Sequence, residues 1–148
     1  MLRERLEAEL KAALKEHDAV KLTVIRQIKA GILVQETKGT RFTLGDDGII
    51  QVIAREIKER REAVAEFERG HRPDLVDKAQ AEIRVLQDFL PPALDPTALR
   101  EAIERAIAET GAVTIKDMGK VMAVLMPIVR GRADGKTVSD LVQDRLAP

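Results

Sequence analysis

Residues 91–96 read PPALDP, and this short stretch decides how the chain is organised. Three prolines in six residues interrupt any helix, because proline has no backbone N–H and clashes with the preceding turn. Asp95 and Pro96 are residue types that start a new helix, as N-cap and as first helical residue. We therefore expect a boundary here, with an N-terminal domain over residues 1–94 and a C-terminal domain over residues 95–148.

Apolar residues recur at helical spacing before this boundary, which predicts four helices. The four apolar faces are Leu2, Leu6, Leu10 and Leu14; Leu22, Ile25, Ile28, Ile32 and Leu33; Ile49, Ile50, Ile53, Ile57, Val64 and Phe67; and Leu75, Val76, Ala79, Ile83, Leu86, Phe89 and Leu90. Asp18 is the expected N-cap of the second helix, Gly39 its stop, and Pro73 belongs to the first turn of the fourth. Residues 39–48 read as a loop, and Gly70 is expected to end the third helix.

Three shorter helices are expected after the boundary. The apolar face of the first comprises Leu99, Ile103 and Ile107. Gly111 should end this helix, and Thr114 with Asp117 has the spacing of a capping box that starts the next. Asp134 is the candidate N-cap of the last. The predicted fold class is all-α, with an N-terminal helical bundle or hairpins followed by a small C-terminal three-helix unit.

Composition restricts the class of protein. The chain has 148 residues, 45% of them hydrophobic, with 25 basic and 25 acidic side chains. No run approaches the ~20 apolar residues that span a bilayer, and charge begins at Arg3, unlike a secretory signal. Cysteine is absent, which excludes disulfides and thiolate sites. We expect a cytoplasmic protein of bacterial type that does not contact a membrane.

Catalytic and cofactor patterns are mostly missing. Ser139 is the only serine and is not in a glycine-flanked elbow, and neither His17 nor His71 has the acid pattern of a triad. The two histidines also lack metal-ligand spacing, so we expect them at helix ends or on the surface. Residues 131–137 are one position short of a phosphate-binding loop. We expect no catalytic centre, no metal and no cofactor.

The strongest functional signal is residues 116–136, KDMGKVMAVLMPIVRGRADGK, called here the basic segment. Its five cations are Lys116, Lys120, Arg130, Arg132 and Lys136, against the two acids Asp117 and Asp134. A local excess of cations in a neutral protein indicates a polyanionic partner. Helix starts present free N–H groups and a positive dipole end to phosphate. We expect the five cations to form one RNA-binding surface.

Glycines organise the basic segment. Gly131, Asp134 and Gly135 are expected to form the turn between two helices, with Asp134 as its cap. Gly119 is expected where two helices pack closely, and Pro127 should kink or end its helix.

Plainer interpretations apply to several of these residues. Cations on a helix are usually its solvated face, which explains about half of the basic segment. Residues 58–62, KERRE, are also interpreted as a solvated face. The methionines Met118, Met122 and Met126 are interpreted as core in preference to a groove for a partner helix. Aromatic residues are only Phe42, Phe67 and Phe89, so RNA contacts should be directed at phosphates and not at stacked bases.

The whole chain resembles the GatB/YqeY family. The motifs that carry the resemblance are Arg26–Ala30, Arg55–Glu62 followed by Phe67, Glu82-Ile83 leading to Phe89–Pro91, Lys116–Met122, Met126-Pro127, Gly131–Lys136 and Val138. The match is end to end, with no room for a larger catalytic-subunit cradle, so the chain looks like the stand-alone YqeY type. The related tail domain belongs to the tRNA-contacting subunit of tRNA-dependent amidotransferases.

The resemblance implies a tRNA-binding or translation-associated accessory protein without its own catalytic centre. Its expected partners are tRNA and a translation or amidotransferase protein, with no DNA. One alternative is a component of carbon–nitrogen ligase activity with glutamine as amido-N-donor. Another is a protein-docking module anchored by the methionine face.

Overall fold

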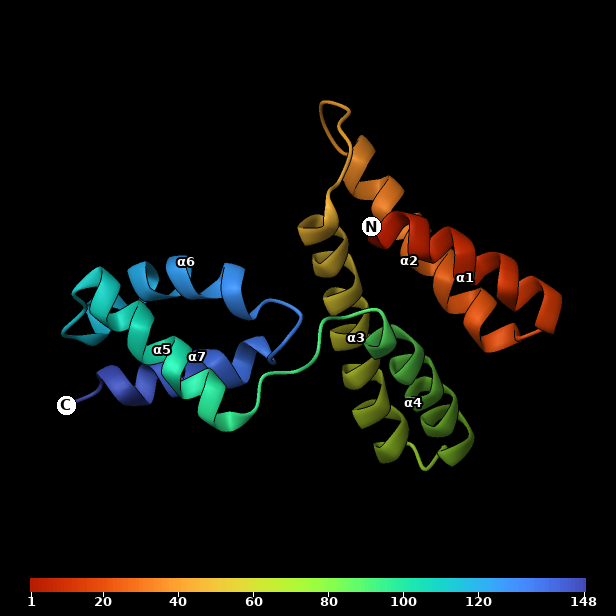
Figure 1. The fold of residues 1–148 in the computed structure, drawn as a ribbon. Coiled ribbons are helices and arrows are strands. Elements are labelled where there is room, and N and C mark those ends of the chain that lie inside the picture. The colour runs from red at the N-terminus through yellow and green to blue at the C-terminus, as the bar shows by residue number, and fades with distance from the viewer. The chain divides into compact units, whose positions relative to one another are not determined.

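A computed structural model describes all residues from Met1 to Pro148. It contains seven α-helices, one 3-10 turn and no strand, so the expected all-α class is confirmed. The chain divides into two compact units, Met1–Leu90 and Pro91–Pro148 (Figure 1). No helix combines the length and the apolar character that crossing a bilayer requires.

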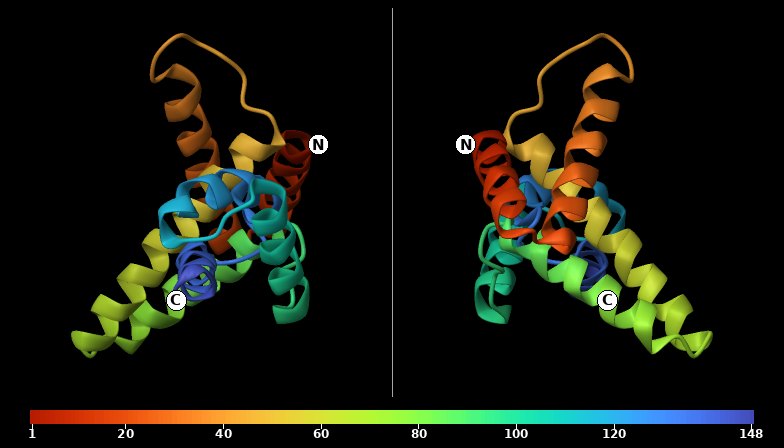
Figure 2. Two further views of the ribbon diagram at one scale, coloured as in Figure 1. Left: turned by 90° about the vertical axis from the view of Figure 1, so that its left-hand side faces the viewer. Right: turned by 90° about the vertical axis from the view of Figure 1, so that its right-hand side faces the viewer.

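The N-terminal unit consists of two helical hairpins (Figures 1 and 2). Its helices are α1 (Leu2–Glu16), α2 (Ala19–Thr37), α3 (Asp46–Arg69) and α4 (Pro73–Asp88). The expected caps are present, because the Asp18 carboxylate accepts the Lys21 N–H at 3.0 Å and Pro73 lies in the first turn of α4. Helix α2 packs on both α3 and α4, which joins the two hairpins.

The core of the N-terminal unit draws on all four helices. Its buried residues are Leu6, Val24, Ile25, Ile28, Ile32, Ile49, Val52, Ile53, Ile57, Ile83, Leu86 and Phe89. At Gly31 a methyl group would lie 2.8 Å from Val52 Cγ1, so α2 and α3 approach closely there. The two hairpins can therefore pack this closely because residue 31 has no side chain.

Two leucines expected in this core are exposed, Leu14 by 49% and Leu33 by 56%. Residues four apart advance by about 40° around a helix, so a stripe of every fourth residue drifts off the buried face by its end. Ala13 is buried in place of Leu14. Leu33 points away because its neighbour Ile32 takes the inward position.

Helix boundaries differ slightly from those expected. Helix α3 begins at Asp46, inside the expected loop, with Gly45 as its N-cap. Acids in the first turn favour this early start through the helix dipole. The Asp46 carboxylate also accepts the Leu2 N–H at 3.1 Å, which ties the start of α1 to the start of α3.

Residues 58–62 form a solvated face as expected, with Arg60 as the one exception. Its side chain is only 12% exposed and lies 2.5 Å from the Glu56 carboxylate and 3.7 Å from that of Glu82 on α4. It also donates to the Gln27 side chain on α2. One guanidinium thus links three helices, whereas its neighbour Arg61 is exposed as expected.

We expect Arg60→Ala to lower the free energy of unfolding by roughly 2 kcal/mol, because it leaves two poorly solvated carboxylates without their cation. Arg61→Ala, one residue away, should change it by less than about 0.5 kcal/mol. Urea titration followed by circular dichroism measures both. Equal effects of the two substitutions would contradict the linking role of Arg60.

The C-terminal unit contains α5 (Pro96–Thr110), a 3-10 turn (Ile115–Asp117), α6 (Met118–Val129) and α7 (Gly135–Leu146). Its buried residues are Leu99, Ala102, Ile103, Ala106, Ile107, Val121, Leu125, Val129, Val138, Val142 and Leu146. The Asp95 carboxylate accepts the Ala98 N–H at 2.7 Å, and Gly111 ends α5 with φ 68°. Pro127 lies inside α6, which ends two residues later.

The segment before α5 packs within this C-terminal unit. The Leu94 N–H donates to the Arg132 carbonyl at 2.8 Å, and Arg132 Nε donates to the Pro92 carbonyl at 3.0 Å. Leu94 also packs against the C-terminal core. The compact unit therefore begins at Pro91, four residues before the expected boundary. The residue that holds this segment, Arg132, lies some 40 residues further along the chain. Independent folding of the two units stays a prediction.

A fragment of residues 91–148 should unfold cooperatively and be more stable than a fragment of residues 95–148. The shorter fragment loses two hydrogen bonds and an apolar contact, which we expect to lower stability by roughly 1–3 kcal/mol. Thermal unfolding followed by circular dichroism provides the comparison. Identical midpoints, or no cooperative transition in the longer fragment, would contradict this.

Candidate functional site

The cations of the basic segment are not neutralised within the protein. None of the five takes part in an ion pair of 4.0 Å or shorter, and the only pair in the C-terminal unit joins Arg145 to Glu104. In the N-terminal unit some exposed cations, such as Lys58 and Arg61, are unpaired as well, whereas seven cationic side chains are paired: Arg3, Arg5, Lys21, Lys29, Arg60, Arg69 and Arg72. The charge of the basic segment is therefore available to a ligand.

Both acids of the basic segment serve as helix caps. The Asp117 carboxylate accepts the N–H groups of Val113 at 2.9 Å and Thr114 at 3.2 Å, and the capping box is complete. These N–H groups, with Lys120 nearby, hold the pKa of Asp117 below its usual value. The carboxylate thus stays ionised, and its cap intact, until the pH falls below the usual range of an aspartate.

The turn after α6 has a defined conformation. Gly131 has φ 75°, in the left-handed region that glycine adopts without strain. The Val129 carbonyl accepts the N–H groups of Arg132 and Ala133, at 2.8 and 3.0 Å. Asp134 accepts the N–H and the hydroxyl of Thr137, at 3.2 and 3.1 Å. Gly135 is then the first residue of α7.

Helix α6 divides the five cations into two groups. Lys116 and Lys120 lie at its start, whereas Arg130, Arg132 and Lys136 lie in and just after the turn that follows it. Twelve residues of α-helix measure about 18 Å, so the groups are separated by that order of distance. The five cations therefore lie in two groups at opposite ends of one helix, and a single RNA-binding surface formed by both groups stays a prediction.

Arg132 differs from the other four cations. Its Nε–H bonds the Pro92 carbonyl and its own carbonyl accepts the Leu94 N–H, so it fixes the segment that leads into α5. Arg130 and Lys136 donate no side-chain hydrogen bond and are free for a ligand. No local sequence pattern indicates this structural role, since Pro92 and Arg132 are 40 residues apart.

The expected role of Gly119 is wrong. Gly119 is exposed, and a methyl group added there would meet no atom within 4 Å. The buried face of α6 is formed by Val121, Leu125 and Val129, and Gly119 lies about 200° from Val121 around the helix. No helix packs closely against Gly119.

Gly119→Ala should raise the free energy of unfolding by about 0.4–1 kcal/mol, because alanine restricts the unfolded chain and fits the open helical site. Gly31→Ala is the matched comparison and should destabilise by roughly 1–3 kcal/mol, through its clash with Val52. Urea unfolding measures both. Destabilisation by the alanine at position 119 would mean that the fold requires this glycine.

The methionines lie at the edge of the C-terminal core. Met118, Met122 and Met126 are half-buried and pack against that core, next to its fully buried residues. The outward side of α6 carries a single charge, Lys120, and its exposed residues include Ile128. The helix thus presents an apolar strip that has cations near both ends.

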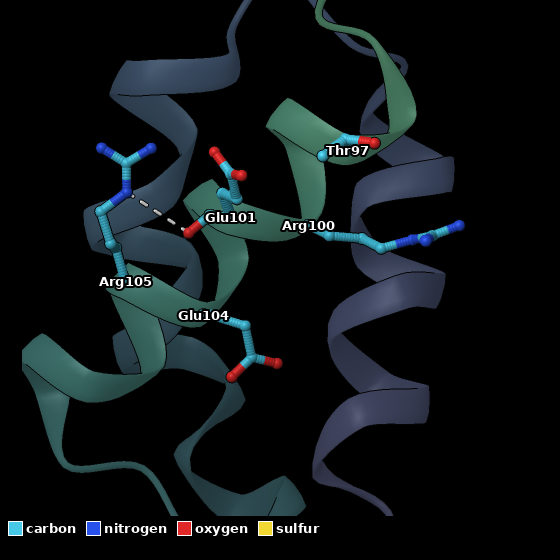
Figure 3. Close-up of a pocket in the computed structure, with 5 residues that line it drawn as sticks. All are labelled: Thr97, Arg100, Glu101, Glu104 and Arg105. Carbon is cyan, nitrogen blue, oxygen red and sulfur yellow. Dashed lines mark hydrogen bonds between the residues drawn. The ribbon is translucent and has the colours of Figure 1, made fainter.

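Helix α5 has a shallow hollow of about 610 Å³, which sequence patterns did not single out (Figure 3). The residues that line it are Thr97, Arg100, Glu101, Glu104 and Arg105. Arg105 Nε donates to the Glu101 carbonyl at 3.4 Å, and Glu104 pairs with Arg145 of α7 at 2.5 Å. Its cations and acids come from one exposed helix flank, so it resembles a solvated surface more than a binding pocket.

Both histidines lie at helix ends, as expected. His17 is the left-handed C-cap of α1 with φ 56°, and His71 follows the end of α3 with φ 54°. Ser139 lies in α7, in the other unit, and makes no hydrogen bond to an acid or base. No group of three or more histidine and carboxylate side chains is arranged to hold a metal ion.

The sequence of residues 3–146 matches the family described as "Yqey-like protein". The chain belongs to this family. The match confirms the resemblance that the sequence motifs indicate over the whole chain. Those motifs lie on α2, α3, α4, α6 and the turn after α6.

Three relatives are each named "Altered inheritance of mitochondria protein 41, mitochondrial". The protein of Pyrenophora tritici-repentis is 31% identical over 145 residues, which are 95% of this YqeY-like chain and 78% of that protein. The Kluyveromyces lactis protein is 31% identical over 70% of this chain and 55% of its own length. The Lachancea thermotolerans protein is 27% identical over 57% of this chain and 46% of its own length. This chain thus spans about half of the latter two.

The expected cytoplasmic, bacterial-type location is contradicted. All three relatives are fungal proteins whose names place them in mitochondria. The expectation rested on the absence of cysteine and on the charged N-terminal stretch. Neither feature distinguishes between compartments that lack disulfides.

Proposed function

We propose that this YqeY-like protein is an RNA-binding accessory protein with tRNA as its ligand, and that the basic segment contacts the RNA phosphates. The supporting observation is the set of five cations without an ion pair, in a segment whose two acids both cap helices. Unpaired cations on a folded surface attract a polyanion and release its counterions on binding.

The spacing of the two groups of cations suits a nucleic-acid helix. A duplex carries one phosphate charge per ~1.7 Å of its axis, so one that lies along α6 offers phosphates to both ends of the helix. No charged residue lies between the two groups, and no acid of α6 repels the RNA backbone. Phosphate contacts carry no sequence information, so different tRNAs should bind with similar affinity.

Arg130→Ala and Lys136→Ala should each weaken tRNA binding and reduce the slope of log K against log[salt] by roughly one unit. Arg132→Ala is a poorer probe, because it also removes the contact to Pro92. With five phosphate contacts the full slope is about −3.5 to −4.5. Fluorescence anisotropy of labelled tRNA over a series of salt concentrations measures it.

Lys58→Ala and Arg61→Ala are the matched controls, since both residues are exposed cations of the N-terminal unit. They should change the slope much less. Equal losses from controls and basic-segment variants would indicate nonspecific attraction. An unchanged slope in the Arg130 and Lys136 variants would mean that the basic segment is only a solvated face and does not bind RNA.

A second candidate function is protein docking at α6. The apolar strip with half-exposed Ile128 and the adaptable Met122 and Met126 favours it. Ile128→Asp separates the candidates, because it adds a charge to the strip and removes no cation. A change of less than a few-fold in tRNA affinity supports direct phosphate contact by the flanking cations. No arrangement of residues favours the carbon–nitrogen ligase alternative.

A further inference from the structure

One of the three phenylalanines lies on the surface. Phe42 is 53% exposed in the loop of residues 38–45, which joins α2 to α3 and extends beyond the helices (Figure 2). Phe89 is buried beneath the Arg5 guanidinium, and Phe67 is half-buried on α3. The two other rings thus serve packing, whereas the Phe42 ring is available to a ligand.

The loop that carries Phe42 is anchored to the N-terminal unit. The Glu36 carboxylate accepts the Leu44 N–H at 2.7 Å and the Arg3 guanidinium at 2.6 Å. Arg3 also donates to the Leu44 carbonyl at 3.2 Å, and the Phe42 N–H donates to the Glu36 carbonyl at 3.3 Å. These bonds fix the backbone at Phe42 and at Leu44, so the loop loses less conformational freedom when a ligand binds.

The loop has the composition of a site for an anion. Its sequence, KGTRFTLG, places Arg41 directly before Phe42 and Lys38 four residues before it, with two threonine hydroxyls and no acid. Neither cation takes part in an ion pair. Of the acids that flank the loop, Glu36 is occupied by its bonds to Arg3 and Leu44, and Asp46 accepts the Leu2 N–H.

We propose that this loop binds an unpaired nucleotide of RNA, with the base stacked on Phe42 and adjacent phosphates contacted by Arg41 and Lys38. Aromatic side chains between cations bind single strands in this way, because every base has a face that can stack. The proposal rests on RNA as the ligand of the proposed function but uses residues of the other unit. It adds a base contact to the phosphate contacts of the basic segment, and so departs from the expectation of phosphate contacts alone because the Phe42 ring is exposed.

Leu33 and Val34 are also exposed, near the end of α2. A protein or a membrane that covered this region would bury them together with Phe42, and would have to supply acids for both loop cations. A nucleotide supplies the ring partner and the anion in one group. Dependence of binding on Leu33 therefore distinguishes RNA from the other two ligands.

Phe42→Trp provides a direct test, because the chain has no other tryptophan and no tyrosine. We expect saturable quenching of its emission by a single-stranded oligouridylate of about ten nucleotides. A duplex RNA of the same length should quench much less. Leu14→Trp is the control, since Leu14 is exposed to a similar extent on α1 but lies between an alanine and a lysine followed by an acid.

Phe42→Leu keeps an apolar side chain and removes the ring, so affinity for the oligouridylate should fall about tenfold, as for the loss of one stacked base. Leu33→Ala should leave that affinity unchanged. Absence of quenching, or equal quenching at position 14, would overturn the proposal. So would a loss of binding on Leu33→Ala, or an emission blue shift on anionic lipid vesicles without quenching by RNA.

Combining Phe42→Trp with Arg130→Ala and Lys136→Ala separates this inference from the proposed function. If the loop binds a nucleotide itself, quenching by the short oligouridylate persists in the combined variant, even where tRNA binding shows no dependence on the basic segment. If tRNA binding depends on the basic segment while Phe42→Trp is not quenched, the loop proposal fails alone.

Discussion

Each helix of this protein has an apolar side, so none is stable by itself and each must cover that side with a neighbour. The pairing of these faces sets the two hairpins of the N-terminal unit and the three helices of the C-terminal unit. The cores are built almost entirely from isoleucine, leucine, valine and alanine. Close contacts such as Gly31 with Val52 then fix how neighbouring helices meet.

Charge is used differently in the two units. In the N-terminal unit, cations join helices, as Arg60 does through ion pairs to Glu56 and Glu82 and a hydrogen bond to Gln27, or hold a loop, as Arg3 does through Glu36. In the C-terminal unit the acids near the cations are helix caps. Asp117 and Asp134 bind backbone N–H groups and form no ion pair, so the five cations of the basic segment stay unpaired although the unit has equal numbers of acids and bases.

Some surface features arise from the same packing. Pairing α6 with α5 and α7 buries Val121, Leu125 and Val129 and turns the rest of an almost uncharged helix outward. Anchoring both sides of the loop at Glu36 leaves Phe42 with no core to enter. Apolar groups exposed in these ways are available for binding partners because the fold does not use them.

Local patterns in the sequence determined the helices. The caps Asp18, Asp95 and Asp134 and the glycine at position 111 act within three or four residues of their partners, so their spacing alone was sufficient. The family was likewise readable from motifs along the chain, as the match over residues 3–146 confirms. The same patterns located the basic segment but could not show whether its cations form ion pairs.

The tertiary structure decided what depends on residues distant in sequence. Arg60 became a link because Gln27 and Glu82 come from other helices, and Arg132 became an anchor because Pro92 lies beside it. Gly119 lost its expected role because which side of α6 faces a neighbour is set by packing. Contacts between distant residues decide whether a cation is paired, whether a ring is exposed and whether a glycine is crowded. Periodicity along one helix carries no information about these contacts.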